Sequence, residues 1–402
     1  MICAMAILFV MALSCLPVSA QNHPLTVEND SISRGNDLTI SLITCYPGSE
    51  IYELCGHSAI RVRGEGIDSI WNFGIFDFNQ PNFVYRFVKG ETDYKGASYP
   101  FKWFMPEYVQ YGRRVVEQDL NLTPDEAKRL HSILQRAVLP QNAVYRYNYI
   151  KDNCSTRILK HVDSASTEKI YYPDSIHYGT FRNEMRAYHE GYPWYQFGID
   201  LALGSGLDGK INSKEEMFVP VELMRQASEA HFADGRPLVK ATRILNEGTP
   251  MAVLPATPWY LGPFFWAWIL AFIIACVVAW NLFSGKLYLP VYVAWFTLTG
   301  LAGCLIAFLV FISEHEATAP NALIVWLNPL QLILAFSMMV KPLRLLAIAL
   351  ACFNILVVGV LLISSPFISQ SFNPAFFPLM LSTLALSATY AILCNKSSYS
   401  RR

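Results

Sequence analysis

The chain has 402 residues, of which 53% are hydrophobic and only 15% are charged, whereas an ordinary globular protein has about 25% charged residues. Six of the 31 basic and two of the 31 acidic residues lie beyond residue 250, so a net charge of −4 in the first 250 residues is offset by +4 in the rest. This composition excludes a wholly soluble protein, a disordered chain and a basic protein that binds nucleic acid. It predicts a water-soluble unit followed by a unit embedded in a bilayer.

The N-terminus has the features of a secretory signal peptide. Residues 2–17 are almost continuously apolar, and Val18-Ser19-Ala20 is a small-residue cleavage pattern, which predicts a signal peptide over residues 1–20. No Lys or Arg precedes the apolar run, so an uncleaved N-terminal anchor is the alternative. Either way, the soluble unit is expected outside the cytoplasm.

Residues 21–250 are predicted to form an α+β domain, a mostly antiparallel sheet with helices packed on it. Alternating apolar residues and β-branched residues predict strands at 38–44, 58–62, 69–73, 113–120 and 144–150. Thr123-Pro124-Asp125-Glu126 is a capping box that opens a helix running to about residue 139. A further helix is expected to begin at Cys154.

After a linker at 251–263, residues 264–395 are predicted to form an all-α transmembrane domain. Five apolar stretches are long enough to cross a bilayer, which takes roughly 17–25 residues. They lie at 264–283, 290–312, 322–340, 345–363 and 375–393. Basic residues occupy alternate loops and the C-terminus, so the positive-inside rule places the C-terminus in the cytoplasm and the N-terminal domain outside.

Polar residues interrupt the third span and the loop before it. The loop contains His315, and the span contains Asn328-Pro329. A proline and an amide at membrane depth indicate a broken helix or the lining of a cavity. An ordinary loop followed by a proline kink explains them equally well. On the first interpretation, His315 and Asn328 belong to a polar pocket that admits a lipid head group or a substrate.

Three of the nine cysteines lie in the mature soluble domain. Cys45 and Cys55 flank one turn and could pair in an oxidising compartment, which would leave Cys154 as the free thiol. Asn153 before it is an N-cap signal, so Cys154 is expected in the first turn of a helix. The backbone N–H groups and the helix dipole there favour the thiolate and lower the thiol pKa.

A nucleophilic thiol needs a base, and His57 is the best candidate among the eight histidines because it lies at the start of a predicted strand. A Cys at a helix start that faces a His on a neighbouring strand is the papain-like arrangement, in which a third polar residue orients the imidazole. Asn72, on the next predicted strand, is our candidate for that third residue. The alternative is a buried structural Cys154 with a histidine at a sheet edge.

The order of the histidine and cysteine motifs along the chain matches that of a known fold. Gly-His-Ser-Ala-Ile-Arg at 56–61, followed by Asp-Asn-Cys-Ser-Thr-Arg at 152–157, resembles the circularly permuted papain-like fold of lecithin:retinol acyltransferase and its relatives. With the signal peptide and the spans, the chain is more closely similar to the Lnb family of bacterial lipoprotein N-acyltransferases. The similar stretches are 47–62, 147–157, Arg182, 200–204 and 314–329.

This resemblance implies an inner-membrane enzyme with a periplasmic domain. Its partners would be a membrane phospholipid as acyl donor and a diacylated lipoprotein as acceptor. Cys154 would carry the acyl chain as a thioester to the α-amine of the lipoprotein's diacylglyceryl-cysteine, with His57 as the base. The backbone N–H groups of Cys154 and Ser155 would stabilise the oxyanion. The predicted substrate-binding residues are Asn153, Ser155, Arg157, Ser58, His315 and Asn328.

Arg157 is interpreted either as a phosphate contact or as a surface residue of its helix. Arg182 and Asp200 are expected to pair for a structural purpose. No cofactor or metal is expected, because no cluster has ligand spacing, and no nucleic-acid partner is expected. Three other functions stay open: a phospholipid esterase, a peptidoglycan amidase and a non-catalytic, membrane-tethered binding protein. The reaction product distinguishes a phospholipid esterase from the acyltransferase. A Cys154 thiol that reacts slowly with alkylating agents would indicate the non-catalytic binding protein.

Overall fold

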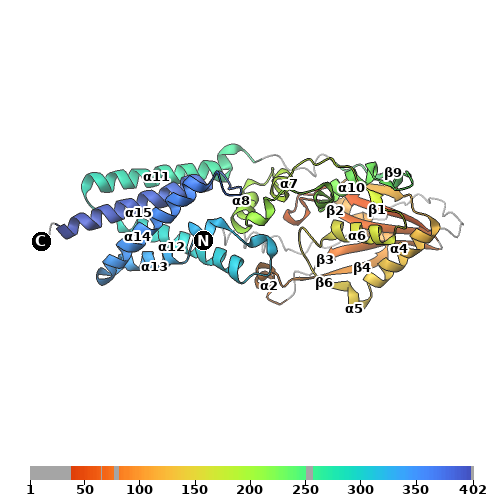
Figure 1. Cartoon of the computed structure of the whole chain (residues 1–402), viewed down its shortest axis with the longest axis horizontal. Coiled ribbons are helices and arrows are strands. Elements are labelled where there is room, and N and C mark those ends of the chain that lie inside the picture. The colour runs from red at the N-terminus through yellow and green to blue at the C-terminus, as the bar shows by residue number, and fades with distance from the viewer. Residues whose placement is uncertain (1–37, 65, 77–80, 250–256, 400–402) are drawn as a thin grey trace.

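The structure is a computed structural model that describes residues 38–64, 66–76, 81–249 and 257–399. The predicted signal peptide lies outside these residues, as does the linker from residue 251 to 256. The described part of the molecule is elongated, with a sheet-containing domain at one end and a bundle of long helices at the other (Figure 1). The predicted fold class, an antiparallel sheet with helices followed by five apolar helices, is confirmed.

The soluble domain is built on one antiparallel sheet of seven strands in the order β6-β4-β3-β2-β1-β5-β9. The strands are Thr39–Cys45 (β1), His57–Gly64 (β2), Ile67–Ile75 (β3), Asp93–Pro100 (β4), Val115–Leu120 (β5), Val144–Arg146 (β6) and Val239–Asn246 (β9). β1, β2, β3 and β5 confirm predicted strands. The strand predicted at 144–150 was too long, because the backbones of Asn148 and Asp152 bond to each other and turn the chain after β6.

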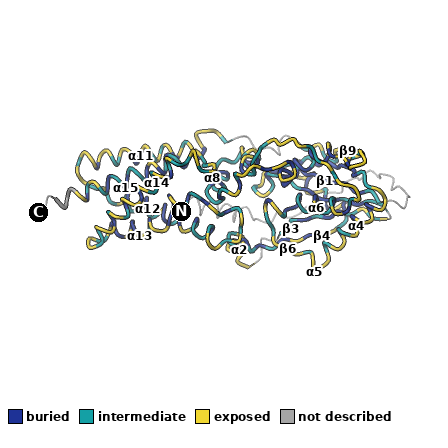
Figure 2. The backbone as a smooth tube through the Cα atoms, viewed as in Figure 1, coloured by how far each residue is buried: buried dark blue, intermediate teal, exposed yellow. Residues whose placement is uncertain are grey.

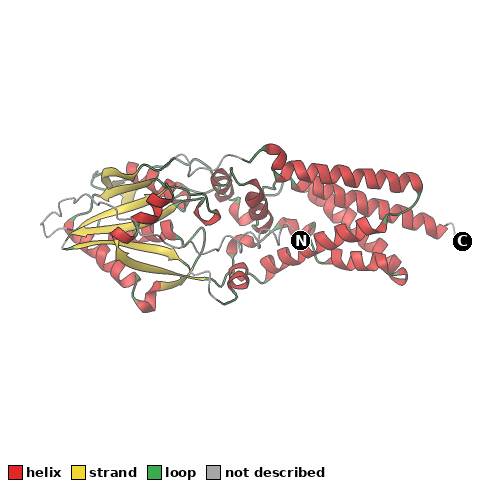
Figure 3. Cartoon of the chain, turned by 180° about the vertical axis from the view of Figure 1, so that it is seen from behind, coloured by secondary structure: helices red, strands yellow, loops and turns green. Residues whose placement is uncertain are grey.

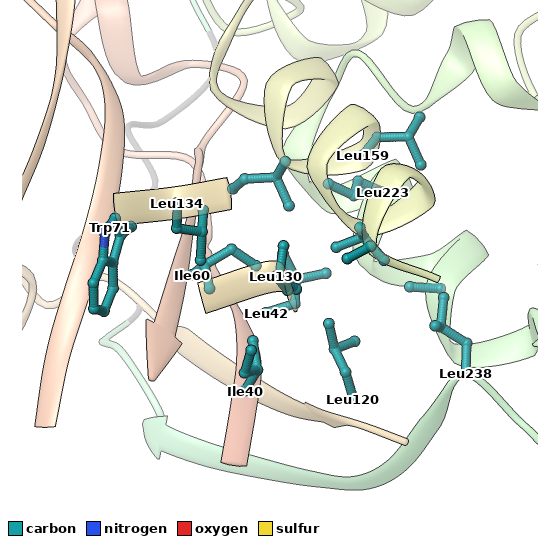
Figure 4. Packing of buried hydrophobic residues seen from close by; sticks show 14 of the residues in the cluster. Ile40, Leu42, Ile60, Trp71, Leu120, Leu130, Leu134, Leu159, Leu223 and Leu238 are labelled. Atoms are coloured by element: carbon teal, nitrogen blue, oxygen red, sulfur yellow. The ribbon is translucent and has the colours of Figure 1, made fainter. Parts of the chain in front are cut away.

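Three helices cover one face of this sheet and bury the main core. They are Pro124–Ala137 (α4), Cys154–Ala165 (α6) and Pro220–Glu229 (α10). Figure 4 shows Leu159 of α6 and Leu223 of α10 beside Leu42 and Ile60 of the sheet. Each fully buried side chain of this kind stabilises the fold by about 1.5–3 kcal/mol. This packing fixes α6 against β2 and β3 and so determines where its N-terminus lies.

The predicted helix start at Thr123 is confirmed, with both hydrogen bonds of the capping box present. The shorter helices are Phe83–Lys89 (α2), Met105–Gln110 (α3), Pro140–Ala143 (α5), Phe181–Tyr188 (α7), Pro193–Ala202 (α8) and Ser213–Glu216 (α9). A two-stranded sheet pairs Ile170–Tyr171 (β7) with His231–Phe232 (β8). Arg182 and Asp200 form the expected ion pair at 2.9 Å, and both side chains are fully buried.

Five candidate spans follow the soluble domain. They comprise Pro263–Ser284 (α11), Leu289–Phe311 (α12), a third span containing Leu330–Met339 (α13), Arg344–Ser364 (α14) and Phe376–Tyr399 (α15). Figure 3 shows the helical bundle and the sheet as separate parts, and Figure 2 shows exposed residues along the outer surface of the bundle. By length and composition, each predicted span has a matching helical segment.

The third span is broken at Asn328-Pro329, which agrees with the first of the two interpretations of its sequence. A 3₁₀ turn, Ala322–Val325, precedes Asn328-Pro329, and α13 begins only at Leu330. Gly303 of α12 allows this segment to pack closely, because a Cβ there would lie 2.5 Å from the backbone of Asn328. The Asn328 amide donates to the carbonyl of Val325 at 3.1 Å. The break is therefore stabilised by packing and local hydrogen bonds.

Candidate active site

The fold brings the predicted thiol and the predicted base together. His57 is the first residue of β2, and Cys154 is the first residue of α6, which packs on β2. Asn153 caps α6, because its Oδ1 accepts from the N–H groups of Ser155 at 2.9 Å and Thr156 at 3.0 Å. Caps of this kind typically stabilise a helix by about 1 kcal/mol. The helix start, and with it the thiol, is held in a defined position.

Asn153 is also fixed at its other end. Its amide nitrogen donates to the carbonyls of Tyr149 at 2.8 Å and Phe218 at 2.9 Å. All hydrogen-bonding positions of this side chain are thus taken up within the protein, although the residue lines the cavity described below. In this structure, Asn153 positions α6 and has little capacity left for a substrate.

A relay of side chains orients the imidazole. His57 Nε2 lies 2.6 Å from Asn72 Oδ1, and Asn72 Nδ2 donates to the hydroxyl of Tyr99 at 3.0 Å. Because Tyr99 accepts from the amide nitrogen, Asn72 presents its oxygen to the ring, and Nε2 is the protonated nitrogen. Nδ1 is then the ring nitrogen available to Cys154. Asn72 thus occupies the place expected for the orienting residue.

The two reacting groups shift each other's pKa. Burial alone would raise the pKa of the Cys154 thiol, but the His57 charge and hydrogen bond, with contributions from Ser58 and Ser155, lower it below its ordinary value. Burial alone would lower the pKa of His57, but the Cys154 charge and the bonds to Cys154 and Asn72 raise it. Both shifts favour a thiolate paired with an imidazolium, the reactive form of a thiol nucleophile.

The other two cysteines of the described soluble domain lack such an environment. Burial raises the pKa of Cys45 to about 12 and that of Cys55 to about 12. Both are free, so the disulfide considered between them is not formed, and Cys55 Sγ instead lies 3.0 Å from the Tyr149 hydroxyl. Cys154 is therefore distinguished by its surroundings, and the argument that it is the thiol left over by pairing was wrong.

Two predicted substrate contacts serve to join β2 to α6. Ser58 Oγ and Ser155 Oγ lie 3.1 Å apart and are fully buried. The N–H of Ser155 is bonded to the cap, so the prediction that it stabilises an oxyanion needs correction. The Cys154 N–H, which the cap does not engage, is the remaining backbone donor at the helix start.

Arg157 is engaged by two neighbours within the soluble domain. Its guanidinium pairs with Asp152 at 2.8 Å and lies 3.3 Å above the Tyr145 ring. The predicted phosphate contact would have to compete with both partners. Neither Arg157 nor Asn328 lines the cavity at the thiol.

A cavity of about 630 Å³ opens at the thiol, within the usual range for a ligand site. Cys154, His57 and Asn72 line it together with many aromatic side chains, and His315 reaches it from the loop after α12. Sequence reasoning had found His315 but not the aromatic wall. Gly74 was also missed, although a glycine inside a strand signals a bulge or a close approach. Its φ is +90°, and a Cβ there would lie 3.8 Å from Cys154.

One cluster in the described residues has the side chains of a metal site. Ligand atoms of His177, Glu216 and Glu222 lie within 4.8 Å of one another. Arg225 already donates to Glu216 at 3.0 Å and to Glu222 at 2.7 Å. We assign no metal there, because the positively charged guanidinium of Arg225 already binds both carboxylates of the cluster.

Comparison with known families agrees with both halves of this architecture. A family model described as the Lnb N-terminal periplasmic domain matches residues 28–184. A second, described as the Lnb transmembrane domain, matches residues 256–398. No curated protein and no solved structure gives a significant match. The two matched regions cover most of the chain, and the protein belongs to the Lnb family.

Proposed function

We propose that this membrane protein is a lipoprotein N-acyltransferase that uses Cys154 as its nucleophile. The observation that carries the proposal is the pairing of a lowered Cys154 pKa with a raised His57 pKa at a cavity that reaches the membrane domain. Membership of the Lnb family supports the choice of acceptor. The soluble domain, 21–250, would lie in the periplasm, the spans within 264–395 in the inner membrane, and the C-terminus in the cytoplasm.

The first half-reaction loads the thiol. The Cys154 thiolate attacks an ester carbonyl of a phospholipid, and the Cys154 N–H stabilises the oxyanion. As the tetrahedral intermediate collapses, the carbon–oxygen bond to glycerol breaks. The His57 imidazolium gives its proton to the departing alkoxide. The products are an acyl thioester on Cys154 and a lysophospholipid.

The second half-reaction transfers the chain to an amine. The neutral α-amine of the lipoprotein's N-terminal diacylglyceryl-cysteine attacks the thioester carbonyl, and His57 takes up its proton. The carbon–sulfur bond breaks, an amide forms, and the thiolate–imidazolium pair returns. Water would release the acyl chain as a free fatty acid, so an apolar cavity wall favours transfer over hydrolysis.

The test is mass spectrometry of the N-terminal lipopeptide of a reporter lipoprotein, in cells with no other N-acyltransferase. Cys154→Ser should abolish N-acylation, whereas the control Cys276→Ser, at an exposed position in α11, should leave it intact. Donor phospholipid without acceptor should leave an acyl mass on Cys154 that hydroxylamine removes. Normal N-acylation by Cys154→Ser would refute the proposal. Free fatty acid as the only product would identify an esterase instead.

A further inference from the structure

A continuous row of aromatic rings leads from the proposed nucleophile to the membrane domain. Neighbouring ring centroids lie 4.1 to 6.4 Å apart. In order, the rings belong to Tyr147, Tyr94, Phe76, Phe83, Phe87 and His315. All six line the cavity. Tyr147 begins the row beside the thiol, since it and Cys154 are both 3.8 Å from the position of a Cβ on Gly74.

Helix α2 supplies the last two phenylalanines of this row and is fixed to the membrane domain. The N–H of Glu314 donates to the carbonyl of Lys89 at 2.7 Å, and Ser313 Oγ donates to that of Val88 at 2.9 Å. His315 Nε2 lies 2.7 Å from the carbonyl of Phe87. The C-terminal end of α2 is therefore held by the loop that follows α12.

The outer surface of α2 is apolar and exposed. Val84 is 46% exposed and Tyr85 is 54% exposed. The Tyr85 ring lies 6.2 Å from the ring of Phe308, which is three residues before the end of α12, or about 4.5 Å along the helix axis. Tyr85 is therefore beside the end of a candidate span, and the ends of spans are where aromatic residues are enriched at the membrane–water interface.

We propose that α2 rests on the periplasm-facing leaflet of the bilayer and admits one acyl chain of a phospholipid into the cavity along the aromatic row. The exposed surface of α2 adjoins the transmembrane helix α12, and the aromatic row ends beside Cys154. Together these two features favour a bilayer lipid as the occupant. The ester carbonyl would reach Cys154 with the chain lying against rings. This inference rests on the proposed function for its chemistry, but membrane contact by α2 stands independently.

Photocrosslinking tests the contact without reference to catalysis. The full-length protein in phosphatidylethanolamine nanodiscs would carry benzoylphenylalanine in place of Tyr85, and the control would carry it in place of Tyr171. Tyr171 is 44% exposed but follows the far, C-terminal end of α6. Irradiation should give a phospholipid mass adduct at position 85 and none at 171. Equal adducts, or none at 85, would overturn the membrane contact.

Kinetics test the path into the cavity. Val84→Glu with Tyr85→Glu should slow acylation of Cys154 by nanodisc phospholipid by about tenfold or more, because carboxylates are disfavoured in an apolar interface. Tyr171→Glu should have no effect. Alkylation of Cys154 by iodoacetamide should be unchanged in both variants, since this small soluble reagent does not need the bilayer.

The outcomes separate the two proposals. Unchanged acylation in the α2 double variant would overturn α2 as the access point, even with an adduct at position 85. Loss of iodoacetamide reactivity would mean that the variant damaged the site, and Val84→Ser with Tyr85→Ser would then replace it under the same criteria. Absence of acylation in the unaltered protein, with an adduct at 85, would refute the proposed chemistry and leave the membrane contact standing.

Discussion

Asn72 links the sheet to the chemistry of the thiol. It pairs with Ala59 of β2 and Ala97 of β4, just before a register shift in β3. Its side chain bonds His57 on one side and Tyr99 on the other. Because the bond to Asn72 helps to raise the pKa of His57, this neutral side chain favours the thiolate–imidazolium pair without adding charge.

Asn72→Ala should therefore shift the pH dependence of Cys154 reactivity. Without the amide, the pKa of His57 falls and that of Cys154 rises, so less thiolate is present at neutral pH. The rate of Cys154 alkylation by iodoacetamide should drop by about tenfold at pH 7. At high pH it should approach the rate of the unaltered protein, because Cys154 is then ionised in both proteins. Tyr99→Phe keeps the amide and should have a smaller effect. A pH profile identical to that of the unaltered protein would remove Asn72 from the role of positioning residue.

At the scale of the element, the start of α6 was predictable because its signals are local. Asn153 before Cys154 predicts a cap, and a cap depends only on a few consecutive residues. The same local rule already implies that the cap engages the N–H groups of the second and third helical residues, here Ser155 and Thr156, so the oxyanion role given to Ser155 could have been corrected from the sequence. The pairing of His57 with Cys154 came instead from comparing the eight histidines and from the papain-like arrangement, because β2 and α6 are far apart in the chain.

The aromatic wall was not predictable in this way. Tyr94 comes from β4, Phe83 from a short helix and Tyr147 from a turn after β6. No common period connects these positions, and their meeting depends on how β3, β4 and α2 are placed in three dimensions. A sequence pattern describes one face of one element, whereas a cavity is made by several.

Asn153→Ala tests whether the cap serves the site. It should lower the free energy of unfolding by about 0.5–2 kcal/mol through loss of the cap. It should also slow acylation of Cys154, because the helix start loses its bonds to Tyr149 and Phe218. Asn212→Ala is the matched control, since Asn212 closes the same kind of capping box on α9. Equal acylation rates in the two variants, measured by intact mass, would contradict a role in positioning.

At the scale of the whole molecule, a second joint ties the soluble domain to the membrane domain, apart from α2. The N–H groups of Gly204 and Ser205 donate to the carbonyls of Ala317 and Pro320, each at 2.8 Å. Arg182, buried behind this turn, donates to the carbonyl of Gly204 at 2.7 Å. The α2 contact and this turn both bind the chain between α12 and α13, so they position the cavity relative to the bilayer together.

Gly204→Ala should break this second joint by steric conflict. A Cβ at this position would lie 2.2 Å from the carbonyl oxygen and 2.7 Å from the carbonyl carbon of Pro320. These are backbone atoms, so the chain must shift, at a cost of about 1–3 kcal/mol. We expect a lower unfolding temperature in detergent and slower acylation of Cys154 by nanodisc phospholipid.

Gly206→Ala separates this effect from a general loss of glycine in the same turn. Its added Cβ would meet its nearest neighbour, the carbonyl oxygen of Ala319, at 3.8 Å, which is ordinary van der Waals contact. That variant should keep both the unfolding temperature and the acylation rate. If Gly204→Ala destabilised the protein but acylated Cys154 at the normal rate, the other contacts between the domains, among them α2 and the bonds of Arg186 to Ser371 and of Asn373 to Asp200, would suffice to hold the thiol at the membrane.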